Sequence, residues 1–149
     1  MTSSQPDPFA PDENGRPHPW VRSLNIIVGA MAASLVVLGV VLVVLGAELA
    51  APEPWLLGLV TLATVGAWGA VLAMRPTRQP GPASVAAVQT TVILRVALLE
   101  APALLGLVLA FLADPLNLLL YVLPAVFSLA GIALFARPGV VIRQINRGV

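Results

Sequence analysis

The chain has no cysteine, no lysine and a single histidine, and each absence excludes a class of chemistry. Without cysteine, the 149 residues hold no disulfide, thiol nucleophile or thiolate metal site. The eight basic residues are all arginine, which leaves no amine for Schiff-base catalysis or for a P-loop. His18 lies between two prolines in a polar tail, where we expect a solvated imidazole. Because no catalytic triad or paired-carboxylate site can be assembled from the other residues, we expect no enzymatic activity, no metal and no cofactor.

Charge is scarce as well. Only 10% of the residues are charged, against about 25% in typical soluble domains. Hydrophobic residues make up 58% of the chain, and its mean hydropathy is +0.94. The net charge of +1 gives no bulk attraction to nucleic acid. Such a chain belongs in a lipid bilayer, and because no alternating strand pattern is present, the sequence predicts an all-α integral membrane protein.

Four apolar runs are long enough to cross the hydrocarbon core, which needs about 20 residues. Helices are predicted at about 26–46, 55–74, 84–113 and 116–136, within a four-helix transmembrane domain that covers residues 24–138. Residues 1–23 contain five prolines and are predicted to form a disordered cytoplasmic tail. Residues 139–149 are predicted to form a short basic cytoplasmic tail.

The charges outside the spans alternate in sign along the chain. The first and third turns carry only acidic residues, which are Glu48, Glu53 and Asp114. The two tails and the second turn carry the arginines Arg16, Arg22, Arg75, Arg78, Arg137, Arg143 and Arg147. By the positive-inside rule, both termini are expected to be cytoplasmic in a bacterial-type plasma (inner) membrane. Arg75-Pro76 and Arg137-Pro138 end the second and fourth runs alike, which predicts a bundle of two like-oriented hairpins.

Two charged residues, Arg95 and Glu100, interrupt the third apolar run. A charge at membrane depth costs roughly 2.5 to 3.5 kcal/mol on insertion scales, so each residue is a candidate for a functional site. If the hydrocarbon core covers residues 93–112, Arg95 lies near its cytoplasmic edge, and we expect its long side chain to extend toward the headgroups. The alternative is that Arg95 is a polar partner inside the protein.

Glu100 is too short and too deep to reach the headgroups in the same way. Five residues at about 100° each place Arg95 and Glu100 roughly 140° apart around the helix. The two side chains are therefore not expected to pair with each other, and each must find a partner elsewhere. For Glu100 that partner is another helix, another subunit, water or a proton, which makes Glu100 the candidate proton-binding residue.

One stretch of the chain resembles a known family. The turn Arg78-Gln79-Pro80 is followed by Ala97-Leu98-Leu99-Glu100-Ala101 and then by Gly106-Leu107-Val108-Leu109-Ala110-Phe111. Over about residues 75–111 this pattern resembles the C-terminal half of the ATP synthase proteolipid, subunit c. The resemblance implies a cytoplasmic turn between two helices and an ion carried by Glu100. Because residues 101–103 offer no hydroxyl beside Glu100, the implied ion is a proton.

Three functions follow from these patterns. The leading prediction is a small polytopic plasma-membrane protein without catalytic activity, in which a mid-membrane carboxylate fixes contacts between helices or subunits. The first alternative is a proteolipid-like element that carries protons on Glu100. The second alternative is an accessory subunit of a transporter. The expected partners are the lipid bilayer and either a second copy of the chain or another membrane protein, with no nucleic acid.

Overall fold

The structure, a computed structural model, describes residues 15–74 and 84–147. Four helical segments in this part of the chain are long and apolar enough to cross a membrane, which confirms the prediction of an all-α protein with four candidate spans. The helices are α1 (Pro19–Val44), α2 (Pro54–Ala73), α3 (Val85–Leu112), α4 (Leu119–Gly131) and α5 (Pro138–Arg147), and α4 continues directly into a π-helix, η1 (Ile132–Ala136).

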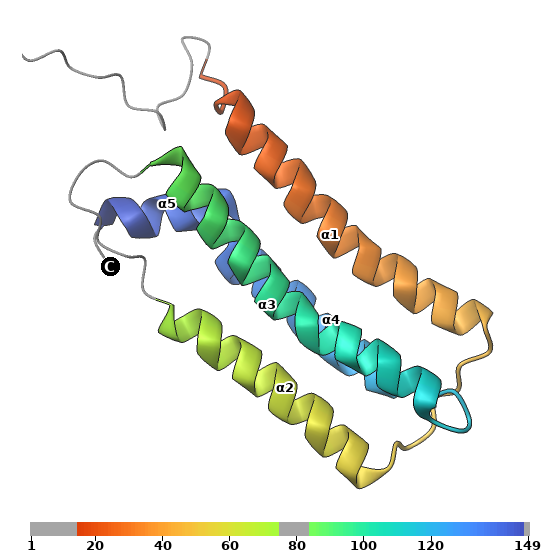
Figure 1. Cartoon of the computed structure of the whole chain (residues 1–149). Coiled ribbons are helices and arrows are strands. Elements are labelled where there is room, and N and C mark those ends of the chain that lie inside the picture. Colours follow the sequence, from red (N-terminus) through yellow and green to blue (C-terminus); the bar gives the residue numbers. More distant parts are fainter. Residues whose placement is uncertain (1–14, 75–83, 148–149) are drawn as a thin grey trace, which may run out of the picture.

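Helices α3 and α4 form the centre of the molecule, and α1 and α2 lie on their flanks (Figure 1). The main contacts of α2 are with α3 and α4, and those of α1 are with α3, α4, η1 and α5. The share of buried residues reflects this order: it is 44% in the spans of α3 and α4, but 17% in α1 and 22% in α2. Of the two predicted hairpins, the second packs as a pair, whereas the main neighbours of both α1 and α2 are the central helices.

Glycine allows α3 and α4 to approach closely. A Cβ atom at Gly106 of α3 would lie 2.3 Å from the carbonyl oxygen of Leu120 and 2.8 Å from the ring of Pro124. Pro124 lacks an N–H, so the Leu120 carbonyl has no helical donor at that position. The Gly106 backbone therefore packs against a carbonyl that has no i+4 donor in its own helix.

Two segments predicted as tails are helical. Helix α1 begins at Pro19, within the predicted tail of residues 1–23, and α5 begins at Pro138 and covers most of the predicted tail of residues 139–149. Proline favours the first helical position in both cases, because its fixed φ suits a helix and its missing N–H would have no partner there. Val141 of α5 is 1% exposed, so this helix is docked on the bundle.

The charges gather at the two ends of the bundle. The start of α1, the end of α2, the start of α3 and α5 lie at one end (Figure 1). We call this the arginine end, because its described residues include Arg16, Arg22, Arg137 and Arg143. At the acidic end lie Glu48, Glu53 and Asp114, in the two connections between α1 and α2 and between α3 and α4.

Backbone and side-chain hydrogen bonds join the two connections at the acidic end. The N–H of Glu48 donates to Leu116 at 2.8 Å, and the N–H of Leu118 donates to the Glu48 carbonyl at 2.9 Å. Asn117, which is 4% exposed, donates from Nδ2 to the Ala50 carbonyl at 3.0 Å. These bonds hold the end of α1 beside the start of α4.

Candidate functional site

Arg95 lies inside the bundle rather than at its surface. Its side chain is 3% exposed, so the expectation that it extends toward the headgroups is wrong. Nη1 donates to the Phe135 carbonyl at 3.0 Å and to Oε1 of Gln144 at 2.8 Å. Nη2 donates to the Met74 carbonyl at 3.4 Å. One guanidinium on α3 therefore contacts the end of α2, the π-helix η1 and α5, and we call this group of four residues the Arg95 cluster.

The acceptors in the Arg95 cluster are available because helices end there. Met74 caps the C-terminus of α2, and Phe135 lies in the last turn of η1, just before Pro138 starts α5. The last carbonyls of a helix have no N–H partner within it and carry the negative end of the helix dipole. Two such helix ends, with an amide oxygen from α5, thus stabilise the positive charge of Arg95.

The chemistry available to the Arg95 cluster is limited. Its three acceptors are backbone and amide oxygens, none of which titrates near neutral pH. Nε of Arg95 is buried and has no hydrogen-bond acceptor in the described part of the chain. The cluster suits the joining of helices, and its groups offer no proton transfer or nucleophile.

Glu100 lies on a different side of α3 and is half-buried. Its Oε1 is 3.4 Å from Oγ of Ser34 on α1, and the same Oγ donates to the Met31 carbonyl at 2.7 Å. Arg95 and Glu100 thus contact different helices, which confirms the expectation that they do not share a face of α3. Ser34 Oγ is the donor in both contacts, and the 3.4 Å bond to Glu100 is the weaker of the two.

A tyrosine that the sequence did not single out joins α1 to α4. Tyr121 is 1% exposed, and its hydroxyl donates to the Leu35 carbonyl at 2.5 Å. Its ring lies against Gly39 of α1, where a Cβ atom would be 3.4 Å away. A buried tyrosine hydroxyl normally finds a hydrogen-bond acceptor. The chain has one tyrosine, and its place within an apolar span was the sequence signal for a hydrogen bond between helices.

The other residues singled out from the sequence are placed as follows. The turn Arg78-Gln79-Pro80 lies outside the described residues. His18 precedes the first residue of α1, and its ring is 6.5 Å from that of Trp20. Within residues 15–74 and 84–147 no three histidine or acidic side chains are grouped so that they could hold a metal ion.

Comparison with known proteins adds no relative. No protein-family model matches the chain, and neither the curated proteins nor the solved structures contain a significant match. The likeness to subunit c therefore depends on the residues quoted for it and stays a prediction, and the function has to be argued from the Arg95 cluster, from Glu100 and from the surface of the bundle.

Proposed function

We propose that the chain is a small polytopic plasma-membrane protein without catalytic activity, in which Arg95 and Glu100 fix the contacts between helices. The observation that carries this proposal is the set of hydrogen bonds from Arg95 to Phe135, Gln144 and Met74. These bonds join four helical elements around one buried cation. Glu100 likewise links α3 to α1, where it accepts a hydrogen bond from Ser34.

The proposed orientation places the arginine end in the cytoplasm. Both termini then lie on the cytoplasmic side of a bacterial-type inner membrane. The segregation of arginines from the acidic connections supports this orientation, because the positive-inside rule counts basic residues close to the ends of the spans.

The surface of α1 and α2 supports the proposal of a partner in the membrane. Most of the residues in these helices are exposed in the single chain, including large apolar side chains such as Val36, Val40 and Leu62. Lipid covers such a surface without cost, and so does a second copy of the chain or another membrane protein. We propose that the partner binds on this surface, with the central α3–α4 pair inside.

Proton binding at Glu100 is the second candidate function. The guanidinium of Arg95 donates to Phe135, Gln144 and Met74 rather than to Glu100. The polar contact of Glu100 is the hydroxyl of Ser34, which donates to Oε1 of Glu100 at 3.4 Å and to the Met31 carbonyl at 2.7 Å. A carboxyl that accepts a proton at this depth is what the resemblance to subunit c requires.

Carbodiimide labelling separates the two candidate functions. Dicyclohexylcarbodiimide reacts with a protonated carboxyl in an apolar environment. The purified protein is labelled over a pH series and Glu100 is identified by mass spectrometry of its peptide, with Glu100→Gln as the control. Labelling of Glu100 that falls as pH rises supports proton exchange. Labelling that does not change with pH supports a fixed structural carboxyl and contradicts proton carriage.

Oligomeric state gives the second measurement. A proteolipid ring needs many copies with Glu100 at the contacts between subunits. A strict monomer, measured by native mass spectrometry or by light scattering in detergent, contradicts the ring. A monomer leaves the structural proposal intact, because the Arg95 cluster is complete within one chain.

A further inference from the structure

Helix α5 lies across the end of the bundle and does not extend away from it. Arg95 donates to the Phe135 carbonyl, in the last turn of η1, and to Oε1 of Gln144, in the second half of α5. Because one guanidinium reaches both residues, the two ends of α5 lie at about the same depth along the bundle. In Figure 1 α5 runs at an angle to the four long helices. The buried side chain of Val141 docks it there.

The depth of α5 in the membrane follows from the span that precedes it. Helix α4 and η1 together form a span of 18 residues, Leu119–Ala136, which is about 27 Å long at 1.5 Å per residue. The hydrocarbon core is roughly 30 Å thick, so both ends of this span lie close to its borders. Arg137 is the next residue of the chain. Helix α5 therefore lies at the depth of the lipid headgroups.

Two exposed arginines belong to this segment. Arg137 directly precedes the first residue of α5, and Arg143 lies two residues after the buried Val141, on the opposite side of the helix. No aspartate or glutamate occurs in the described residues of the arginine end, which are 15–25, 70–74, 84–92 and 132–147. The negative charge that balances Arg137 and Arg143 therefore does not come from these residues.

We propose that α5 is an interfacial helix on which Arg137 and Arg143 bind the phosphate of an anionic phospholipid. Lipid phosphates are the abundant negative groups at headgroup depth, and each basic residue near the membrane surface strengthens the binding of anionic lipid about fivefold. A helix with one face docked and with arginine on the other is suited to this layer. The inference does not depend on which side of the membrane the arginine end faces.

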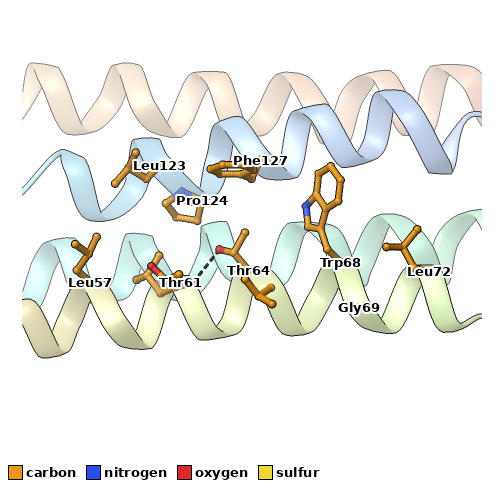
Figure 2. Close-up of a pocket in the computed structure, with 11 residues that line it drawn as sticks. Leu57, Thr61, Thr64, Trp68, Gly69, Leu72, Leu123, Pro124 and Phe127 are labelled. Carbon is orange, nitrogen blue, oxygen red and sulfur yellow. Dashed lines mark hydrogen bonds between the residues drawn. The ribbon is translucent and has the colours of Figure 1, made fainter.

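The hollow between α2 and α4 does not suit the same ligand. It is lined by uncharged side chains only, from Leu57 to Leu72 on α2 and from Leu123 to Phe127 on α4 (Figure 2). A phosphate in this hollow would lose its hydration without gaining a cation. Soluble anions and acidic protein segments are disfavoured at α5 for another reason, because lipid headgroups already surround a helix at this depth.

The bound lipid and the Arg95 cluster act on the same helix. Arg143 directly precedes Gln144, the residue of α5 that accepts from Arg95. A phosphate held by Arg143 therefore favours the docked position of α5. A ligand that binds only the folded state raises the unfolding temperature. We expect the anionic lipid to stabilise the bundle in this way.

Thermal unfolding in mixed micelles tests the proposal. Phosphatidylglycerol and phosphatidylcholine with the same acyl chains are titrated separately into the purified full chain, and the rise in unfolding temperature is measured relative to the protein without lipid. We expect a saturable rise with phosphatidylglycerol that becomes smaller as salt is added, and little rise with phosphatidylcholine. Equal rises with the two lipids, or no rise with phosphatidylglycerol, would overturn the proposal.

Variants locate the site on α5. Arg137→Gln combined with Arg143→Gln should raise the Kd for phosphatidylglycerol about 25-fold, which is fivefold for each arginine. Arg137→Lys combined with Arg143→Lys should retain most of the affinity, because lysine also binds phosphate as a point charge. Glu48→Gln is the control, since it removes an exposed charge at the acidic end and should bind as the parent protein does. Parent-like binding by the glutamine pair would show that α5 is not the site.

Soluble anions distinguish the lipid from other ligands of the same charge. Inorganic phosphate, or a polyglutamate peptide that stands in for an acidic protein segment, replaces the lipid in the same detergent. A rise in unfolding temperature equal to that with phosphatidylglycerol would overturn the lipid as the ligand. Native mass spectrometry gives an independent readout: phosphatidylglycerol that the parent protein retains and the glutamine pair loses supports the site, and equal retention contradicts it.

Discussion

The guanidinium of Arg95 donates to the backbone carbonyl of Phe135 at 3.0 Å, across 40 residues of the chain. Phe135 offers this carbonyl because the π-helix η1 ends there and Pro138 starts α5 in a new direction. Arg95 thus depends on where other helices end. The cation in turn satisfies carbonyls that lipid would leave without a donor.

The first prediction is that removal of this cation destabilises the protein. Arg95→Met keeps an unbranched apolar side chain but removes the donor from the carbonyls of Met74 and Phe135, which belong to half-buried residues. Each such group costs about 1–3 kcal/mol, so we expect stability to fall by about 3 kcal/mol in thermal unfolding in detergent. The stability of Arg95→Lys should lie between that of the parent protein and that of Arg95→Met. Lysine keeps the positive charge, but its single ammonium group lacks the planar guanidinium that donates to several acceptors at once.

Arg143→Gln is the control for charge alone. Arg143 is exposed on α5, so its loss should change stability by no more than about 0.5 kcal/mol. If Arg95→Met is as stable as the parent protein, the Arg95 cluster does not hold the bundle together, and the structural proposal for Arg95 fails.

The close approach of α3 and α4 gives the second prediction. At Gly106 even a methyl group would lie 2.3 Å from a backbone oxygen, which cannot rotate away. Gly106→Ala should therefore lower the unfolding temperature and cost about 3 kcal/mol, at the upper end of overpacking effects. Gly58→Ala on α2 is the matched control, because its Cβ meets nothing within 4 Å and alanine favours a helix. Equal behaviour of the two variants would contradict the packing of α3 on α4.

Glu100→Gln tests the state of the mid-membrane carboxyl. A glutamine side chain keeps an oxygen that accepts from Ser34, so we expect a change in stability of less than about 1 kcal/mol. The measurement is thermal unfolding of the two proteins in the same detergent. A much larger loss would mean that the ionised form of Glu100 makes a stronger contact than the 3.4 Å hydrogen bond from Ser34.

The attachment of α1 gives a prediction of its own. Tyr121→Phe keeps the ring against Gly39 but removes the hydrogen bond to Leu35, which should lower stability by about 1 kcal/mol. Ser23→Ala also removes one hydroxyl, but that hydroxyl donates to Pro19 within the exposed first turn of α1, and no measurable change is expected. Unfolding curves that rank the two variants in the opposite order would show that Tyr121 does not hold α1.

The sequence predicts the membrane spans well because one property, the length of an apolar run, determines where they lie. Twenty apolar residues cross the hydrocarbon core whatever their partners, and the sign of the flanking charges follows the ends of the helices. Pairing is harder to predict. In lipid the outer surface of a helix is as apolar as its inner surface, so the hydrophobic pattern does not mark which face of α1 or α2 turns inward.

The partners of Arg95 and Tyr121 could not be predicted for a related reason. Three of their acceptors are backbone carbonyls, at Met74, Phe135 and Leu35, and every residue carries such a group. Which carbonyl is free depends on helix ends that differ from the expected ones, above all at the start of α5. The angle of roughly 140° around α3, by contrast, was enough to predict that Arg95 and Glu100 contact different helices.

A double-mutant cycle isolates the bond between α3 and α5. Nη1 of Arg95 lies 2.8 Å from Oε1 of Gln144, and groups that share a hydrogen bond show coupling of about 0.5–3 kcal/mol. We expect the losses from Arg95→Met and Gln144→Leu to fall short of additivity by about 1 kcal/mol, because either change alone breaks the same bond. The pair Arg95→Met with Arg143→Gln should be additive. Additive losses in both pairs would mean that α5 is held by the burial of Val141 rather than by Arg95.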